Sequence, residues 1–187
     1  MTFEVEQKYH VDDPDDLERR IVDLGGKPGP AERHNDSYFN HPCRDFVETK
    51  EALRIRRVDG RPYVTYKGPK LPGAIKARKE LEWTIAPGDP DGTLTEQLWR
   101  ELGFRPVATV SKTRRTFRFN NHLQTFGVMM DDVDRLGSFA EIELVVGGPT
   151  EVERARQQIA ELAARLELNR DESSSYLRMF LALDTPE

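Results

Sequence analysis

The stretch Phe3-Glu4-Val5-Glu6-Gln7-Lys8-Tyr9-His10-Val11 alternates between charged and apolar side chains. Side chains at positions i and i+2 of a β-strand point to the same side of the sheet. Glu4, Glu6 and Lys8 therefore share one face of an extended chain, and the intervening positions form a mostly apolar face. The stretch predicts a strand with one buried face and one strongly charged face.

Six further segments show the same period of two, which predicts more strands of this kind. They span residues 53–58, 63–67, 78–85, 112–119, 127–132 and 140–146. The charges on them are sorted by sign, as Glu-x-Glu or as Arg-x-Arg and Lys-x-Arg pairs. One interpretation is an ordinary sheet whose charged face meets solvent, although such a face gains nothing from the sorting. The alternative is a closed sheet whose polar face points inward around a charged ligand.

Together these faces offer as many cations as acids, if all of them point the same way. The cations are Lys8, Arg54, Arg56, Lys67, Arg78, Lys112 and Arg114, and the acids are Glu4, Glu6, Glu80, Glu82, Asp131, Glu141 and Glu143. Arginine and lysine bind phosphate oxygens. Carboxylates bind hard divalent cations such as Mg²⁺, together with substrate phosphates. A cavity that supplies both sets suits a metal-bound triphosphate.

The composition excludes several other classes of protein. The 187 residues include 28 Lys and Arg, 33 Asp and Glu and one cysteine, Cys43, which excludes an internal disulfide framework and a cysteine-based zinc site. No apolar run approaches the roughly 20 residues of a membrane-spanning helix, and no signal peptide is expected. The net charge of −5 argues against nucleic acid as a partner. We expect a cytoplasmic protein that does not bind membranes.

Helical spacing of apolar residues predicts four helices between and after the strands. They start at Asp13-Pro14, at Thr93 or Thr95, at a capping box formed by Thr150 and Glu153, and near Tyr176. Trp83 and Trp99 lie on apolar faces and are expected in the core. The four histidines (His10, His34, His41 and His122) lack metal-ligand spacing, so we expect surface or packing roles. No linker divides the chain, so we expect one domain over residues 1–187.

Short motifs along nearly the whole chain resemble those of a known family. They are Glu4-Val5-Glu6-Gln7-Lys8, Ala52-Leu53-Arg54-Ile55-Arg56, Tyr66-Lys67-Gly68-Pro69, Glu80-Leu81-Glu82, Ser111-Lys112-Thr113-Arg114 and Phe139-Ala140-Glu141-Ile142-Glu143. In this order they resemble the CYTH superfamily, the triphosphate tunnel metalloenzymes. The run from Asp36 to Pro42 and the segment Leu136-Gly137-Ser138-Phe139 are most similar to its class IV adenylate cyclase (CyaB-like) branch.

The resemblance implies an α+β, mainly β fold: a closed eight-stranded antiparallel barrel that forms a tunnel, with helices packed outside. It also implies roles for the sorted charges. Glu4, Glu6, Asp131, Glu141 and Glu143 match metal-binding carboxylates, here for Mg²⁺ or Mn²⁺. Lys8, Arg54, Arg56, Lys67, Arg78, Lys112 and Arg114 match phosphate-binding residues, of which Lys8 and Arg114 join Asp131 as expected catalytic residues. Glu80 and Glu82 match secondary acidic positions of the tunnel.

By this resemblance the leading hypothesis is a metal-dependent adenylate cyclase, which converts ATP to cyclic AMP and pyrophosphate. A triphosphatase that hydrolyses inorganic, thiamine or nucleoside triphosphate is the alternative within the same class. A non-catalytic polyphosphate-binding module is the alternative from another class, and it would need the cations but not the carboxylates. The oligomeric state stays open, and a homodimer is one alternative.

Overall fold

The computed structural model describes residues 3–72, 75–85, 87–121 and 124–183, so that His122 lies outside the described part. In this part the strands are β1 (Phe3–His10), β2 (Lys27–Asn40), β3 (Ala52–Val58), β4 (Arg61–Lys67), β5 (Lys76–Thr84), β6 (Arg105–Asn121), β7 (Gln124–Val133), β8 (Gly137–Val146) and β9 (Asp171–Glu172). The α-helices are α1 (Pro14–Asp23), α2 (Phe46–Thr49), α3 (Thr93–Glu101), α4 (Val152–Arg165) and α5 (Tyr176–Leu183).

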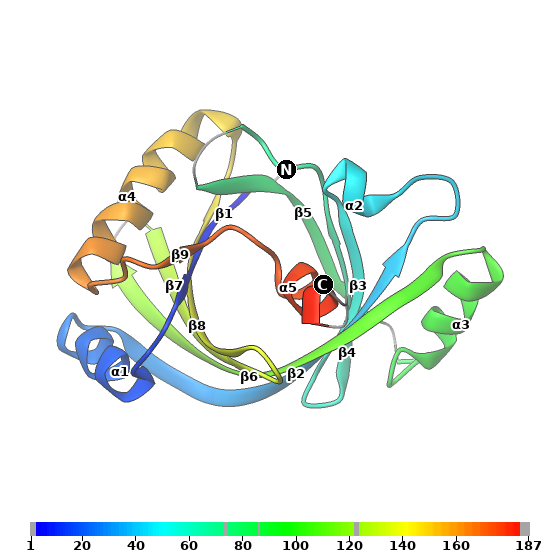
Figure 1. Cartoon of the computed structure of the whole chain (residues 1–187), viewed down its shortest axis with the longest axis horizontal. Helices are drawn as coiled ribbons and strands as arrows, with labels where there is room; N and C mark the ends of the chain where they lie inside the picture. Colours follow the sequence, from blue (N-terminus) through cyan, green and yellow to red (C-terminus); the bar gives the residue numbers. More distant parts are fainter. Residues whose placement is uncertain (1–2, 73–74, 86, 122–123, 184–187) are drawn as a thin grey trace.

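The strands form an antiparallel sheet in the order β5-β4-β3-β2-β6-β7-β8-β1, with β9 added outside β1. A second pairing of β1, with β5, closes this sheet into an eight-stranded barrel, in which Glu4 lies opposite Arg78 and Glu6 opposite Lys76. The predicted fold class is confirmed. Figure 1 shows the barrel nearly end on, with β1 in dark blue crossing from the α1 side toward β5.

The long strand β2 has no clear alternation in its first half, where Pro28 and Pro30 remove two backbone donors. Its pairing with β6 shifts register between Pro28 and Ala31, which accommodates these prolines. From Ala31 to Tyr38 the pairing is regular, before a second shift between Tyr38 and Phe39, and His34, Asp36 and Tyr38 are buried. The sequence patterns therefore did not predict a strand that supplies part of the barrel interior.

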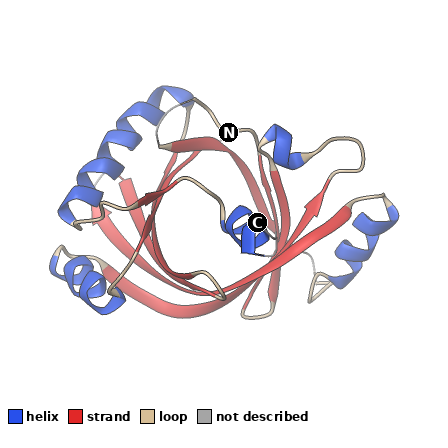
Figure 2. Cartoon of the chain, viewed as in Figure 1, coloured by secondary structure: helices blue, strands red, loops and turns tan. Residues whose placement is uncertain are grey.

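The outward apolar faces of the barrel are covered by helices at two places (Figure 2). On one side α1 and α4 bury Ile21 and Ile159 against strand residues such as Val5 and Ile142. On the other side α2 and α3 cover a cluster of Phe39, Phe46, Leu53, Ile55 and Val64, against which Trp99 packs. These contacts follow from the apolar half of each strand's alternation.

Trp83 was expected in the core, and this prediction was wrong. Its side chain is 53% exposed, on the outward face of β5. The helix α4 packs on β1 and β8, and α3 packs against β6, so neither covers this end of β5. Leu81, two residues earlier on the same face, is also exposed.

The helix termini agree with the sequence signals in one case and depart from them in another. The Asp13 side chain caps α1 by accepting a hydrogen bond from the Asp16 amide, and Pro14 occupies the first turn. The capping box predicted at Thr150 is not formed. A 3₁₀ turn over Pro149–Glu151 delays the start of α4 to Val152, and the N-cap residue Glu151 makes no side-chain capping bond.

Helix α5 does not pack on the outside of the barrel. Its Tyr176 is buried against Val110, Val133 and Phe139, which line the interior. Figure 1 shows α5 within the outline of the barrel, where it covers one end of the interior. Among the helices that the structure describes, none combines the length and the apolar character needed to cross a membrane.

Candidate functional site: a charged cavity inside the barrel

The barrel encloses a cavity of about 1000 Å³ whose wall carries most of the sorted charges. All seven of the predicted cations line it, together with six of the seven predicted acids. These residues are Lys8, Arg54, Arg56, Lys67, Arg78, Lys112, Arg114, Glu4, Glu6, Glu80, Glu82, Glu141 and Glu143. The charged faces of the separate strands thus point to the same interior, rather than to solvent. Asp131 does not line the cavity.

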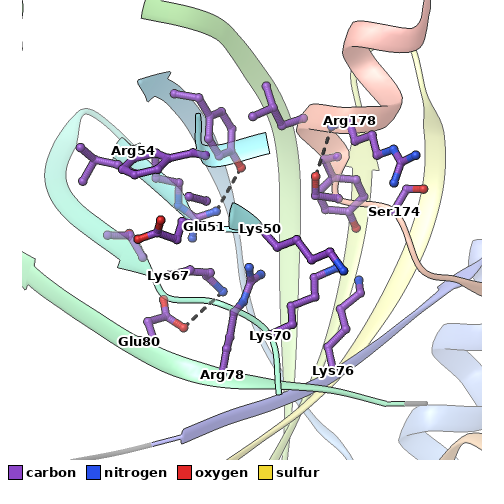
Figure 3. A pocket seen from close by; sticks show the side chains of 18 of the residues that line it. Lys50, Glu51, Arg54, Lys67, Lys70, Lys76, Arg78, Glu80, Ser174 and Arg178 are labelled. Carbon is purple, nitrogen blue, oxygen red and sulfur yellow. Dashed lines mark hydrogen bonds and ion pairs between the residues drawn. The ribbon is translucent and has the colours of Figure 1, made fainter. Parts of the chain in front are cut away.

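One group of charges is centred on Lys67 of β4. The ammonium nitrogen of Lys67 lies 2.6 Å from both carboxylate oxygens of Glu4. It also lies 3.2 Å from a carboxylate oxygen of Glu80, the residue opposite Lys67 on β5 (Figure 3). Burial opposes the charge of Lys67, but Glu4, Glu6 and Glu80 outweigh it and raise the pKa of Lys67. Glu82 lies at the exposed end of this strand face, where its carboxylate accepts a hydrogen bond from Thr65.

A second group contains Glu6 and Glu143, of which Glu6 is close to Arg78 (3.4 Å), Lys67 (4.0 Å) and Lys76 (4.0 Å). Glu6 of β1 and Glu143 of β8 are direct cross-strand partners on the inner face. Among the described residues, Glu143 has no hydrogen-bond or ion-pair partner. Burial and the charge of Glu4, followed by that of Glu6, raise the pKa of Glu143 to about 8. Burial also raises the pKa of Glu4, despite the attraction of Lys67.

Two arginines of β3 are fixed by Asp36 of β2, a residue whose role the sequence analysis missed. Arg56 contacts the carboxylate of Asp36 through Nε (2.7 Å) and Nη2 (2.8 Å), and Arg54 donates to it through Nη1 at 3.1 Å. Burial opposes the ionised form, but Arg54 and Arg56 outweigh it and hold the pKa of Asp36 well below its usual range. Asp36 thus holds both guanidinium groups beside the cavity.

Asp131 of β7 has a similar relation to the cations of β6. Arg114 donates to both of its carboxylate oxygens, at 2.6 and 2.5 Å, and Lys112 donates at 2.9 Å. The Tyr176 hydroxyl of α5 adds a fourth hydrogen bond, at 2.8 Å. Although burial opposes ionisation, Arg114 and Lys112 lower the pKa of Asp131 to about 2. All of these donors surround a carboxylate that lies behind the cavity wall.

Glu141 of β8 and Lys8 of β1 connect this group to the rest of the wall. Arg114 donates to Glu141 at 2.5 Å, and the Lys8 ammonium lies 3.6 Å from the other carboxylate oxygen of Glu141. Lys8 also donates to the Ser174 carbonyl at 3.0 Å and lies 3.5 Å from the centre of the Tyr176 ring. The segment that precedes α5 is therefore held by the same lysine that faces the cavity.

The five carboxylates that resemble metal ligands differ in what surrounds them. Glu4, Glu6 and Glu143 form an oxygen-rich group with excess negative charge, which fits a hard divalent cation chemically. Asp131 and Glu141 are occupied by Lys112, Arg114 and Lys8, and Glu4 is occupied by Lys67. Within the described ranges, no three such side chains converge as a complete metal cage. A divalent cation here would need substrate phosphates to complete its coordination, as is usual for Mg²⁺.

The cavity also contains residues that the sequence analysis did not assign to the site. They include Tyr38, Lys50, Lys70, Lys76, Val107, Tyr176, Leu177, Arg178 and Leu181. Lys76 could have been found, because it precedes Arg78 by two residues and extends the same alternation. His34 is buried beside the cations rather than at the surface, and burial and Arg56 lower its pKa to about 3. No local pattern marked His34 or Lys70.

Comparisons with known proteins agree with this geometry. A model of the CYTH domain matches residues 2–176. A protein of Methanocaldococcus jannaschii, named "Putative adenylate cyclase MJ0240", is 34% identical over 95% of this chain and 98% of its own. Adenylate cyclase CyaB of Aeromonas hydrophila is 29% identical over 89% of this chain and 82% of its own. The structure of the PH1819 protein from Pyrococcus horikoshii OT3, 34% identical, superposes with a TM-score of 0.85 and covers 96% of this chain and 99% of that one. The chain therefore belongs to the CYTH domain family.

Proposed function

We propose that this protein is a metal-dependent enzyme that converts ATP to cyclic AMP and pyrophosphate inside the barrel. The observation that carries the proposal is the cavity inside the barrel, where all seven predicted cations and six of the predicted carboxylates meet. The cations suit the oxygens of a triphosphate, and the carboxylates suit its divalent cation. Two relatives named as adenylate cyclases, one of them putatively, favour this reaction within the family.

An apolar part of the cavity wall supports a substrate with an organic group. Val107 at the start of β6 and Leu177 and Leu181 of α5 line the cavity together with its charges. An inorganic triphosphate has no apolar surface that could pack against this part of the wall. A nucleoside attached to the triphosphate would bury them, which is favourable.

In the proposed reaction the ribose 3′-hydroxyl loses its proton to solvent and its oxygen attacks the α-phosphorus, while the bond from this phosphorus to the pyrophosphate oxygen breaks. Arg54, Arg56 and Arg114 would bind the phosphate oxygens and stabilise the charge that develops on the leaving pyrophosphate. Asp36 and Asp131 would act as positioning residues that hold these guanidinium groups in place. Glu4, Glu6 and Glu143 would hold Mg²⁺ or Mn²⁺, which lowers the pKa of the attacking hydroxyl when bound. The barrel and α5 would limit the access of water.

A comparison of ATP, 3′-deoxy-ATP and inorganic triphosphate tests the proposal. We expect cyclic AMP and pyrophosphate from ATP, and inhibition without turnover by 3′-deoxy-ATP, because it lacks the attacking hydroxyl. Release of orthophosphate from 3′-deoxy-ATP at the rate seen with ATP would identify a triphosphatase instead. Binding of ATP and metal without any product would identify a binding module.

A further inference from the structure

Strand β1 has two neighbours along one of its edges, while β8 occupies the whole of the other edge. Strand β5 pairs with residues 3–6 of β1, and the two-residue strand β9 pairs with Lys8 and Tyr9. After β9 the chain passes through residues 173–175, all of which line the cavity, and enters α5 (Figure 1). This segment, the strap (residues 170–175), therefore completes the wall of the cavity where the pairing between β1 and β5 ends.

The strap is fastened to β1 through the side chains of His10 and Glu172. Nε2 of His10 lies 3.2 Å from one carboxylate oxygen of Glu172, and the other oxygen accepts a hydrogen bond from the Ser174 amide at 2.5 Å. Although burial opposes ionisation, the hydrogen bonds from Ser174 and His10 lower the pKa of Glu172. An ionised carboxylate only accepts hydrogen bonds, so Nε2 of His10 carries the hydrogen. Each oxygen of Glu172 thus has its own donor.

The position of Ser174 affects two groups of the cavity wall. Its carbonyl accepts a hydrogen bond from the Lys8 ammonium at 3.0 Å. Two residues later, the ring of Tyr176 lies 3.5 Å from the same ammonium, and the Tyr176 hydroxyl donates to Asp131 at 2.8 Å. Asp131 in turn accepts hydrogen bonds from Arg114. A displacement of the strap would therefore disturb Lys8 directly and Arg114 through Tyr176 and Asp131.

We infer that His10 and Glu172 are positioning residues, which hold the strap on β1 and so keep Lys8 and Tyr176 in place for substrate binding. The inference rests on the proposed function, because Lys8 and Arg114 are taken to bind the substrate. The described lining of the cavity contains neither His10 nor Glu172, so both act through the strap and not by contact with the substrate. When the strap detaches, only the molecules with a closed wall bind substrate, and the apparent affinity falls in proportion to their fraction.

Hydrogen–deuterium exchange of the 187-residue chain, followed by mass spectrometry, tests the attachment without any substrate. In His10→Ala, peptides that cover residues 172–178 should exchange about tenfold faster, because a hydrogen bond to a charged group is lost. In His10→Gln, the side-chain amide still donates to Glu172 and should restore most of the protection. Asp12→Asn is the matched control, since the exposed ion pair of Asp12 and Arg170 also joins the strap to the chain next to β1. Exposed ion pairs contribute little, so this variant should exchange as the wild type does.

Steady-state kinetics of cyclic AMP formation test the positioning role. His10→Ala should raise KM for ATP by about fivefold to tenfold and change kcat by less than about twofold, because a loosened strap lowers the competent fraction and not the rate of the chemical step. His10→Gln should restore KM. Glu172→Gln keeps one acceptor oxygen of the two and should raise both exchange and KM, which provides a second variant if His10→Ala does not fold.

The outcomes separate this inference from the proposed function. Unchanged exchange in His10→Ala and Glu172→Gln, or an equal increase in Asp12→Asn, would overturn the attachment. Faster exchange with an unchanged KM would overturn the positioning role, because the two residues would then support only the structure of the strap. A wild-type protein that forms no cyclic AMP would overturn the proposed function, while exchange and calorimetric binding of a non-hydrolysable ATP analogue would still decide the role of His10 and Glu172.

Discussion

Glu6 and Glu143 lie directly opposite each other on the antiparallel strands β1 and β8, and both side chains line the cavity. Like charges in directly opposite positions destabilise a sheet. The pair therefore lowers the stability of the barrel unless a cation is bound between the two carboxylates or one of them is protonated. The raised pKa of Glu143 shows the same excess of negative charge.

The first prediction concerns this pair. Glu143→Gln keeps the shape of the side chain but removes its charge. The Mg²⁺ concentration for half-maximal activity should therefore rise by at least about tenfold. Loss of a residue that only supports a metal ligand already weakens metal binding by about this factor. A metal titration of product formation measures this. Glu161→Gln, exposed on α4 and outside the cavity lining, is the control and should leave the half-maximal concentration unchanged. Full activity after exhaustive chelation would contradict the metal site as a whole.

A second prediction compares two adjacent arginines on opposite faces of β3. Arg56 lines the cavity, whereas the Arg57 guanidinium contacts the Asp91 carbonyl and Glu96 outside it. Arg56→Ala should weaken triphosphate binding by about tenfold or more, because it removes charge-assisted hydrogen bonds. Arg57→Ala should bind as the wild type does. Calorimetric titration with a non-hydrolysable ATP analogue measures both, and equal effects would show that the inner face of β3 does not contact the substrate.

The third prediction concerns Asp36, whose carboxylate is almost fully buried between Arg54 and Arg56. Asp36→Asn leaves two buried guanidinium groups without their anion and should lower the free energy of unfolding by about 3–5 kcal/mol. Asp132→Asn, exposed on the outer face of β7, should change it by less than about 0.5 kcal/mol. Urea unfolding measures both variants. If they lose the same amount, Asp36 does not hold the arginines.

The fourth prediction is a pH dependence of stability caused by His34. Its pKa is about 3 in the folded protein against 6.5 ordinarily, so below pH 6.5 the unfolded chain binds a proton that the folded chain does not. Stability from this group is therefore lost as the pH falls. Between pH 7 and pH 5 the loss should be about 2 kcal/mol. Unfolding curves of the wild type and of His34→Asn measure it. The variant should lack this part of the acid sensitivity, and parallel pH profiles would contradict the assignment.

The period of two predicted the charged strand faces because it records directly which side chains share a face, whereas the closed barrel was implied by the family resemblance. Arg54 and Arg56, for example, lie inward as their alternation with Leu53 and Ile55 requires. The alternation does not record which strands become neighbours. Whether Asp131 faces a metal or an arginine depends on its register with Arg114, which only the folded barrel shows.

Other features escaped prediction for different physical reasons. Pro28 and Pro30 interrupt the strand pattern before Asp36, so this strand was not predicted. In the structure a register shift between Pro28 and Ala31 accommodates both prolines. The apolar spacing of α5 predicted a helix but not the surface that it covers, because an apolar stripe fits any apolar partner. Trp83 shows the converse, since it lies on an apolar strand face and its side chain is nevertheless exposed.

The two pairings of β1 have a consequence for how the protein is made. Glu4, Glu6 and Lys8 are synthesised before strands β2 to β7, and their neighbours on β8 follow only after these strands. Until then the strand has no partner on that side, and the cavity has no continuous wall. Contacts between such distant segments form slowly, because a long loop must close first. The site is thus completed in a late step of folding, and a nascent chain that lacks β8 cannot hold its carboxylates and cations in their final arrangement.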